Sequence, residues 1–268
     1  MKQIIIINDD TPEAEHAARF ALLIAQKTRV DILLANTVAI PTLETVTVSN
    51  DRPTGQSSLQ DELIALNDHS DDFKPVINEI DCSGMNEVQL AEFINSKGID
   101  LIVKGEQQAP YFLHANLNMQ TVLNKVCCPL LLIPINAPFK VIERIVYLAD
   151  LRYCRRYVVS YLAKLAKPFR ADIAVAHFSA KGLPDIDPKY AEDLFLDNVQ
   201  QYVHYESLFL NNTKERDMVK AVDVLINGMH NDLLVMVNHR YHFEEILGRY
   251  ITDALPSTIT VPIMVFPY

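Results

Sequence analysis

Residues 4–9 read IIIIND, an apolar run that ends at Asp9. The same pattern returns 141 positions later, where residues 145–150 read IVYLAD and end at Asp150. A short apolar run that stops at a polar residue is typical of a buried strand. Because the run recurs, the sequence indicates two copies of one structural unit.

Three further pairs of blocks repeat in the same order along the chain. The pairs are VDILLA (30–35) with ADIAVA (171–176), IDLIVK (99–104) with NDLLVM (231–236), and CPLLLIP (128–134) with VPIMVFP (261–267). We therefore predict a tandem duplication, with one copy in residues 1–136 and the other in residues 137–268. The final strands of the two copies are apolar, and such strands need protected edges.

Strands and helices alternate within each copy, which predicts the α/β class and an open, five-stranded parallel sheet flanked by helices. In the first copy we predict strands at 3–7, 30–36, 76–80, 101–104 and 130–133, and helices at 12–28, 59–66, 86–96 and 117–125. In the second copy we predict helices at 152–166, 188–205, 217–227 and 243–255. Ligands of such sheets bind outside the carboxyl ends of the strands, so candidate site residues are those that follow the first and fourth strands.

Composition excludes several classes of protein. Only 7 glycines occur in 268 residues, and neither GxGxxG nor GxxxxGK[ST] is present. The net charge is −10, with −9 in residues 1–136 and −1 in residues 137–268, which argues against a nucleic-acid partner. Apolar runs are too short for a membrane span, so we expect no membrane partner. The four cysteines show no CxxC spacing, and we expect reduced thiols in a cytoplasmic protein.

The repeated blocks resemble the universal stress protein family over essentially the whole chain. The family's features are a first strand that ends in Asp, a fourth strand of the type D-[LI]-[LIV]-V-[MK]-G, and a final strand that begins with C/V-P. The resemblance implies two tandem Rossmann-like domains of the adenine nucleotide alpha hydrolase type, packed as an intrachain pseudo-dimer. Members of the family often pair their final strands across a dimer, so the resemblance also implies that the apolar final strands of the two copies pair with each other within this chain.

Family members that bind ATP share a G-x2-G-x9-G-[ST] loop after strand four, whose glycines admit the phosphates. Here Gly105 fills the first place in the first copy, but Gln108 stands at the second. In the second copy Val237 and Arg240 replace the first two glycines, and only Gly248 falls near the third. Both loops depart from the pattern, so we expect no cofactor, and ATP stays an alternative.

Two further sets of residues are candidate site residues. By the resemblance, Asp9 and Asp150 would face adenine or ribose; alternatively each aspartate caps the helix that follows it. In the second copy, Arg152, His239, Arg240 and Arg249 follow neighbouring strands and would converge as an anion site made of side chains; alternatively they are solvated cations.

Histidines and catalytic motifs give weaker signals. His239 and His242 have helical i, i+3 spacing, but HExxH is absent, and surface histidines are the preferred interpretation over zinc. We interpret His177 as a packed or site-lining residue. No GxSxG elbow or activated cysteine is found, so we expect no enzymatic activity.

These observations predict a non-enzymatic, cytoplasmic, universal stress protein-like binding or regulatory protein with ATP binding lost or reduced. One alternative is an adenine-nucleotide switch with weak ATP hydrolysis in the second copy, and another is an assembly scaffold without a ligand. The expected partner is an unidentified protein, with a small anion or nucleotide as a further ligand and a homodimer as an open assembly.

Overall fold

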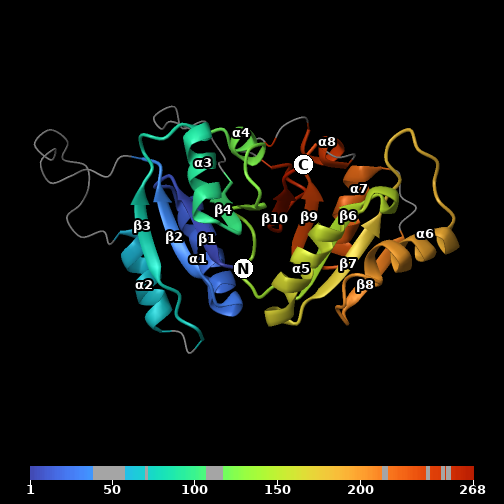
Figure 1. Ribbon diagram of the computed structural model, residues 1–268, viewed down its shortest axis with the longest axis horizontal. Helices are drawn as coiled ribbons and strands as arrows, with labels where there is room; N and C mark the ends of the chain where they lie inside the picture. The colour runs from blue at the N-terminus through green and yellow to red at the C-terminus, as the bar shows by residue number, and fades with distance from the viewer. Residues whose placement is uncertain are drawn as a thin grey trace, which may run out of the picture.

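The computed structural model describes residues 1–38, 58–69, 72–106, 117–212, 217–239, 242–248, 251 and 255–268. Strands and helices alternate along both halves of the chain (Figure 1). The first half contains β1 (Gln3–Asn8), α1 (Pro12–Thr28), β2 (Asp31–Asn36), α2 (Leu59–Asp68), β3 (Ile77–Asp81), α3 (Glu87–Lys97), β4 (Leu101–Gly105), α4 (Met119–Leu123) and β5 (Leu130–Ile133).

The second half follows the same order and adds short turns of other helix types. It contains β6 (Arg144–Ala149), a 3-10 turn (Leu151–Tyr153), α5 (Arg156–Phe169), β7 (Asp172–His177), α6 (Pro188–Phe195), a π-helical turn (Leu196–Gln200), β8 (Leu208–Asn212), α7 (Met218–Asp223), a second π-helical turn (Val224–Gly228), β9 (Leu233–Val237), α8 (His242–Leu247) and β10 (Ile263–Phe266).

The strands of the described residues form one sheet of ten strands in the order β3-β2-β1-β4-β5-β10-β9-β6-β7-β8. Every neighbouring pair is parallel except β5 and β10, which are antiparallel, with Leu131 opposite Met264. The expected pairing of the two final strands is therefore confirmed. It joins two five-stranded parallel sheets and removes an edge from each.

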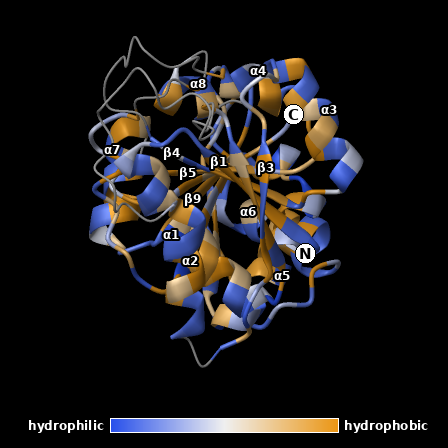
Figure 2. Cartoon of the chain, turned by 90° about the vertical axis from the view of Figure 1, so that its left-hand side faces the viewer, coloured by the Kyte–Doolittle hydropathy of each residue, from blue (hydrophilic) through white to orange (hydrophobic). Residues whose placement is uncertain are grey.

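Helices cover both faces of the sheet and define two hydrophobic layers. One layer packs residues of α1, α2, α5 and α6 against the sheet, and the other packs residues of α3, α4, α7 and α8 against the opposite face. In Figure 2 the apolar strands run between these helices, whose polar sides point outward. Buried on both faces, β1, β4 and β9 read as continuous apolar runs instead of alternating ones.

Helix ends agree with local chemistry in the first half. Thr11 caps α1 by accepting a hydrogen bond from the amide of Ala14 at 3.2 Å, and Pro12 stands at the first helical position, where it costs no hydrogen bond. Gly98, with φ of 64°, ends α3 in the left-handed conformation that its sequence position predicts.

Several boundaries in the second half differ from the predictions. The helix predicted at 152–166 begins at Arg156, because the chain first makes a 3-10 turn after Asp150. The helix predicted at 243–255 is α8, which ends at Leu247, and Gly248 follows with a left-handed φ of 79°. The edge strand β8 completes the five-stranded sheet predicted for the second copy, but no residue range was predicted for it. Within the described residues, no helix is both long and apolar enough to cross a membrane.

Candidate functional site

The candidate site of each copy lies where its first and fourth strands end. In the sheet order, β1 lies between β2 and β4, and β6 lies between β7 and β9. Crossovers leave these central strands in opposite directions, which opens a crevice at their carboxyl ends. Asp9 and Asp150, two of the candidate residues, lie at these points.

In the first copy Asp9 contacts groups of its own chain. Its Oδ1 accepts a hydrogen bond from the hydroxyl of Thr11 at 2.6 Å, and its Oδ2 lies 3.7 Å from Nζ of Lys104. Both side chains are almost completely buried. Because Thr11 is the capping residue of α1, the alternative that Asp9 caps this helix is wrong; Asp9 instead holds the cap in place.

Gly105 has a packing role in this copy. A Cβ at this position would lie 2.3 Å from the backbone oxygen of Glu13 in α1, so the helix and β4 approach more closely than any side chain permits. The glycine thus admits the backbone of α1. The loop after it, which contains Gln108, lies outside the described residues.

In the second copy Asp150 is held by four hydrogen bonds. Its carboxylate accepts them from the backbone amide (3.1 Å), Nε (2.8 Å) and Nη2 (2.5 Å) of Arg152, and from the amide of Ala180 (2.9 Å). Burial raises the pKa of Asp150, but the hydrogen bonds from Arg152 and Ala180 outweigh burial and leave this pKa below its usual value. The aspartate caps the 3-10 turn that follows β6, as the capping alternative predicts.

Arg152 is directed inward. Besides its contacts with Asp150, its Nη1 donates to the backbone oxygen of Pro184 at 3.1 Å, which ties the end of β6 to the loop after β7. The hydrogen bond and charge of Asp150 raise the pKa of Arg152. The guanidinium group is thus already engaged by its own chain.

Two buried histidines, His177 and His242, lie near the ion pair of Asp150 and Arg152. Nδ1 of His177 accepts a hydrogen bond from the amide of Leu151 at 3.2 Å, so this ring nitrogen carries no proton. Nε2 of His242 lies 3.0 Å from the backbone oxygen of Phe178, and its Nδ1 lies 3.8 Å from Oε2 of Glu245. Burial lowers the pKa of both histidines below the usual value. His177 is thus a packed residue, as interpreted from the sequence.

Of the remaining cationic candidates of the second copy, only His239 lies in the described residues. His239 is exposed, and its Nε2 lies 3.1 Å from Nε2 of Gln120 in the first copy. Arg240 and Arg249 lie outside the described residues, so their part in the anion site stays a prediction. His239 and His242 point to different partners, and no cluster of metal-ligating side chains occurs in the part of the chain that the structure describes.

A small cavity lies at the ends of β6 and β9 among the described residues. Asp150, Tyr153, Val237 and Phe243 are among the residues around a cavity of about 20 Å³, which is room for one water molecule. Pockets that hold a nucleotide-sized ligand measure roughly 300–1,000 Å³. The described cavity at the point where the fold type places its ligand in the second copy is therefore too small for a nucleotide, and residues 240, 241, 249 and 250 of this region lie outside the described residues.

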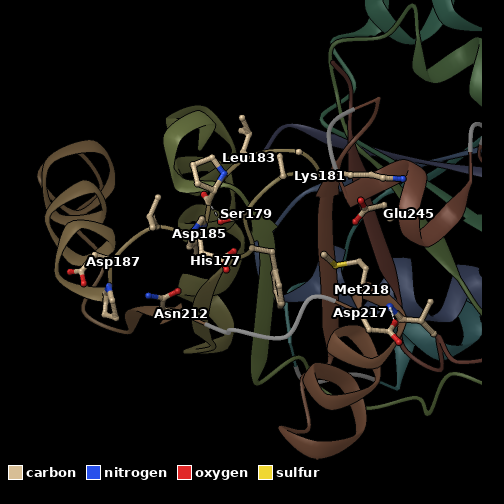
Figure 3. Close-up of a pocket in the computed structure, with 17 residues that line it drawn as sticks. His177, Ser179, Lys181, Leu183, Asp185, Asp187, Asn212, Asp217, Met218 and Glu245 are labelled. Carbon is tan, nitrogen blue, oxygen red and sulfur yellow. Dashed lines mark hydrogen bonds between the residues drawn. The ribbon is translucent and has the colours of Figure 1, made fainter.

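A much larger cleft of about 840 Å³ lies beside it, at the ends of β7 and β8 (Figure 3). Its walls are the loop of residues 177–188, Asn212, the start of α7 and Glu245 of α8. Among the described residues, the charged lining comprises one cation, Lys181, and four carboxylates, Asp185, Asp187, Asp217 and Glu245. These described groups disfavour a phosphate or another small anion.

Polar side chains also join the two copies near their sites. Gln120 donates from Nε2 to the side-chain oxygens of Asn124 and Asn238, at 3.0 Å each, and its Oε1 accepts from the amide of Ile251 at 2.8 Å. Across the same junction, Oε1 of Glu106 accepts from the amide of Leu255 at 2.7 Å. These bonds thus join the two copies through polar contacts near the carboxyl ends of β4 and β9.

The preference for surface histidines is wrong for His242, which is buried. Sequence reasoning did not place Lys104 or the aspartates of the cleft in the site region. Signals for them were present. Lys104 is a charged residue at the end of an apolar strand, and residues 182–187 read GLPDID, a composition typical of a surface loop that follows a strand.

Taken together, the duplicated α/β unit and its parallel sheets flanked by helices define a Rossmann-like α/β protein. The model of the universal stress protein family matches residues 1–134, and the chain belongs to this family. Among curated proteins, no sequence matches the chain.

Solved structures share the fold over the whole chain. A universal stress protein from Archaeoglobus fulgidus DSM 4304 is 14% identical, with a TM-score of 0.59 over 98% of this chain and 97% of that one. A functionally unknown protein from Pseudomonas aeruginosa PAO1 is 13% identical, with a TM-score of 0.58 over 99% and 92%. At this identity the likeness is one of fold, and it covers both halves of the ten-stranded sheet.

Proposed function

We propose that the chain is a non-enzymatic binding or regulatory member of the universal stress protein family in which ATP binding is lost or reduced. The observation that carries the proposal is that Asp150 is engaged by Arg152 and Ala180, beside a cavity that measures only about 20 Å³ among the described residues at the ends of β6 and β9. A nucleotide would have to displace these contacts before it could bind there.

The first copy supports the proposal independently. Asp9 is paired with Lys104 and Thr11, and Gly105 admits the backbone of α1. The loop that follows Gly105 has glutamine where ATP-binding relatives have their second glycine. Two of the features that a nucleotide would use are therefore occupied by the chain itself.

A non-enzymatic, cytoplasmic role agrees with the state of the cysteines. All four are free thiols, and burial raises the pKa of Cys128 and Cys154 to about 12. A thiol with such a pKa stays protonated and is a poor nucleophile. Free thiols are the usual state in reducing compartments, which supports a cytoplasmic location.

A thermal melting screen against MgATP, MgADP and inorganic phosphate tests the proposal. A ligand at ~100 times its Kd would add about 2.7 kcal/mol of stability, which raises Tm by roughly 5–10 °C in a chain of this size. We expect no such shift at millimolar nucleotide. A relative that carries the complete G-x2-G-x9-G-[ST] loop serves as the positive control.

Two results would contradict the proposal. A rise of Tm with MgATP that disappears in Arg240→Ala would favour the nucleotide switch in the second copy. Release of phosphate from ATP by the wild-type chain, and not by Asp150→Asn, would contradict the non-enzymatic role.

A further inference from the structure

Helix α5 and the turn before it form a cationic segment in an acidic protein. Residues 151–171 contain six arginines and lysines and no aspartate or glutamate, whereas the whole chain has a net charge of −10. Arg152 is paired with Asp150, as described above. Among the described residues, no salt bridge involves the other five cations, which are Arg155, Arg156, Lys164, Lys167 and Arg170.

Two of these cations are held in fixed positions by aromatic rings. The guanidinium carbon of Arg156 lies 3.7 Å from the ring centroid of Tyr202, and its Nε donates to the backbone oxygen of Asn198 at 3.1 Å. The guanidinium carbon of Arg155 lies 5.8 Å from the centroid of Tyr157, and its Nη1 donates to the hydroxyl of that tyrosine at 3.2 Å. Both guanidinium groups are therefore pre-organised, which reduces the entropy that a partner must overcome.

The positions of Arg155 and Arg156 at the start of α5 destabilise this helix. Arg155 is the N-cap of α5 and Arg156 is its first residue; no side chain caps this end, and no acidic residue stands in the first turn. Positive charge at the N-terminus of a helix faces the positive end of the macrodipole. Two arginines at this end therefore cost folding free energy and need another explanation.

The surrounding surface has the composition of a protein-binding site. We define the Arg–Tyr surface as Arg155, Arg156, Tyr157 and Tyr202. The two tyrosines are 48% and 53% exposed, although α5 packs its opposite side into the core. Arginine and tyrosine are the residue types most enriched where a few side chains dominate binding.

We propose that the Arg–Tyr surface docks an acidic segment of another protein, with carboxylates bound by the guanidinium groups of Arg155 and Arg156. Planar guanidinium groups bind carboxylates through two parallel hydrogen bonds, and the tyrosine rings supply apolar contact beside them. This inference goes beyond the proposed function and does not depend on whether the chain binds a nucleotide.

Charge favours this partner over the others that a cationic surface would fit. A second copy that docked the same surface about a two-fold axis would place arginine against arginine. A nucleic acid or an anionic membrane extends far beyond the surface and would be repelled by the rest of a chain of charge −10. A short acidic segment engages only local cations within a Debye length of about 10 Å.

The test measures binding of a short fluorescein-labelled poly-L-glutamate by fluorescence anisotropy. We expect the wild-type chain to bind it and the double variant R155Q/R156Q to bind at least about tenfold more weakly, the loss that roughly 1.4 kcal/mol produces. The matched control is K97Q/K125Q, which removes the same charge from exposed positions in the first copy, where Lys97 also lies over an aromatic ring. Its affinity should stay near that of the wild type.

Two further variants separate docking from folding. R156K keeps the positive charge but replaces the planar guanidinium group with an ammonium group. It should therefore weaken binding of poly-L-glutamate while Tm stays that of the wild type. Tyr202→Leu keeps apolar area and should weaken binding by removing the ring under Arg156. If poly-L-glutamate does not bind, or if R155Q/R156Q and K97Q/K125Q bind it equally, the proposal is overturned. Tighter, arginine-dependent binding of a single-stranded oligonucleotide or of phosphatidylserine vesicles would also overturn the choice of an acidic protein segment.

Discussion

The guanidinium group of Arg152 donates two hydrogen bonds to the carboxylate of Asp150, with Nε 2.8 Å from Oδ1 and Nη2 2.5 Å from Oδ2. In the other copy, Lys104 lies 3.7 Å from the carboxylate of Asp9. The two cations come from different elements, one from the turn after the first strand and the other from the fourth strand. In both copies the aspartate at the end of the first strand is thus paired with a cation of its own chain.

Removing Arg152 should be strongly destabilising, because the side chain of Asp150 is completely buried. We expect Arg152→Met to lower the free energy of unfolding by about 3 kcal/mol, since it leaves an uncompensated charge in the interior. Urea unfolding measures the change. The double variant Asp150→Asn/Arg152→Met should lose less than Arg152→Met alone, and Lys164→Met on the exposed side of α5 should change stability by less than about 0.5 kcal/mol. Equal losses in Arg152→Met and Lys164→Met would show that the pair is not a buried ion pair.

Stability should rise with pH through the range in which the buried histidines titrate. His177 and His242 have folded-state pKa values below their usual value of 6.5, because burial disfavours the charged form. The unfolded chain therefore binds more protons as the pH falls below about 6.5, so the stability contributed by neutral histidines is complete above that pH and is lost below it.

The variant His242→Gln tests this dependence, since its amide can still donate to the backbone oxygen of Phe178. We expect the slope of unfolding free energy against pH, between about pH 5 and 6.5, to decrease by up to about 1.4 kcal/mol per pH unit. His204→Gln, at an exposed position, should leave the slope unchanged. If both variants gave the wild-type slope, His242 would not contribute to the acid sensitivity of the fold.

Much of the fold could be predicted from local sequence. Strands such as β1 and β9 are runs of apolar residues, and the repetition of these runs is enough to set the order of elements in both copies. The pairing of β5 with β10 was predicted from the family resemblance together with the need of two apolar edges for cover. The strands themselves could be predicted because burial on both faces of a sheet leaves a continuous apolar run in the sequence.

The candidate site was less predictable, because side-chain direction depends on tertiary neighbours. Arg152 was expected to bind an anionic ligand, but in the structure its guanidinium group donates instead to the buried carboxylate of Asp150. The residue range of the edge strand β8 was not predicted, because its sequence LFLNN ends in two polar residues. As an edge strand, β8 pairs with only one other strand, β7. In each case the deciding partner lies far from the residue in the sequence or depends on the geometry of a turn that local sequence does not specify.

Gly105 should tolerate no side chain. A Cβ there would lie 2.3 Å from the backbone oxygen of Glu13, so either β4 or the start of α1 would have to move. We expect Gly105→Ala to destabilise the chain by about 1–3 kcal/mol, the usual cost of overpacking. Gly84→Ala is the matched control, since nothing lies within 4 Å of its added methyl group, and it should be neutral or slightly stabilising. Thermal melting of both variants gives the comparison, and a Gly105→Ala protein as stable as Gly84→Ala would refute the close approach.

The junction between the copies should depend on Gln120, whose side chain contacts Asn124, Asn238 and the amide of Ile251. Gln120→Ala leaves the Ile251 amide without its acceptor, and Ile251 is itself a buried residue. We expect a loss of about 1–3 kcal/mol, the cost of an unsatisfied buried donor, with faster hydrogen exchange at Ile251.

Gln120→Glu provides the matched comparison at the same position. It keeps the oxygen that accepts from Ile251 but removes the amide that donates to Asn124 and Asn238, so exchange at Ile251 should stay slow while stability decreases. Exchange at Leu255, whose amide bonds to Glu106, reports whether the effect spreads along the junction. Faster exchange at both amides in Gln120→Ala would show that the two contacts open as one unit. Unchanged exchange at Ile251 in Gln120→Ala would show instead that the β5–β10 pairing alone holds the copies together.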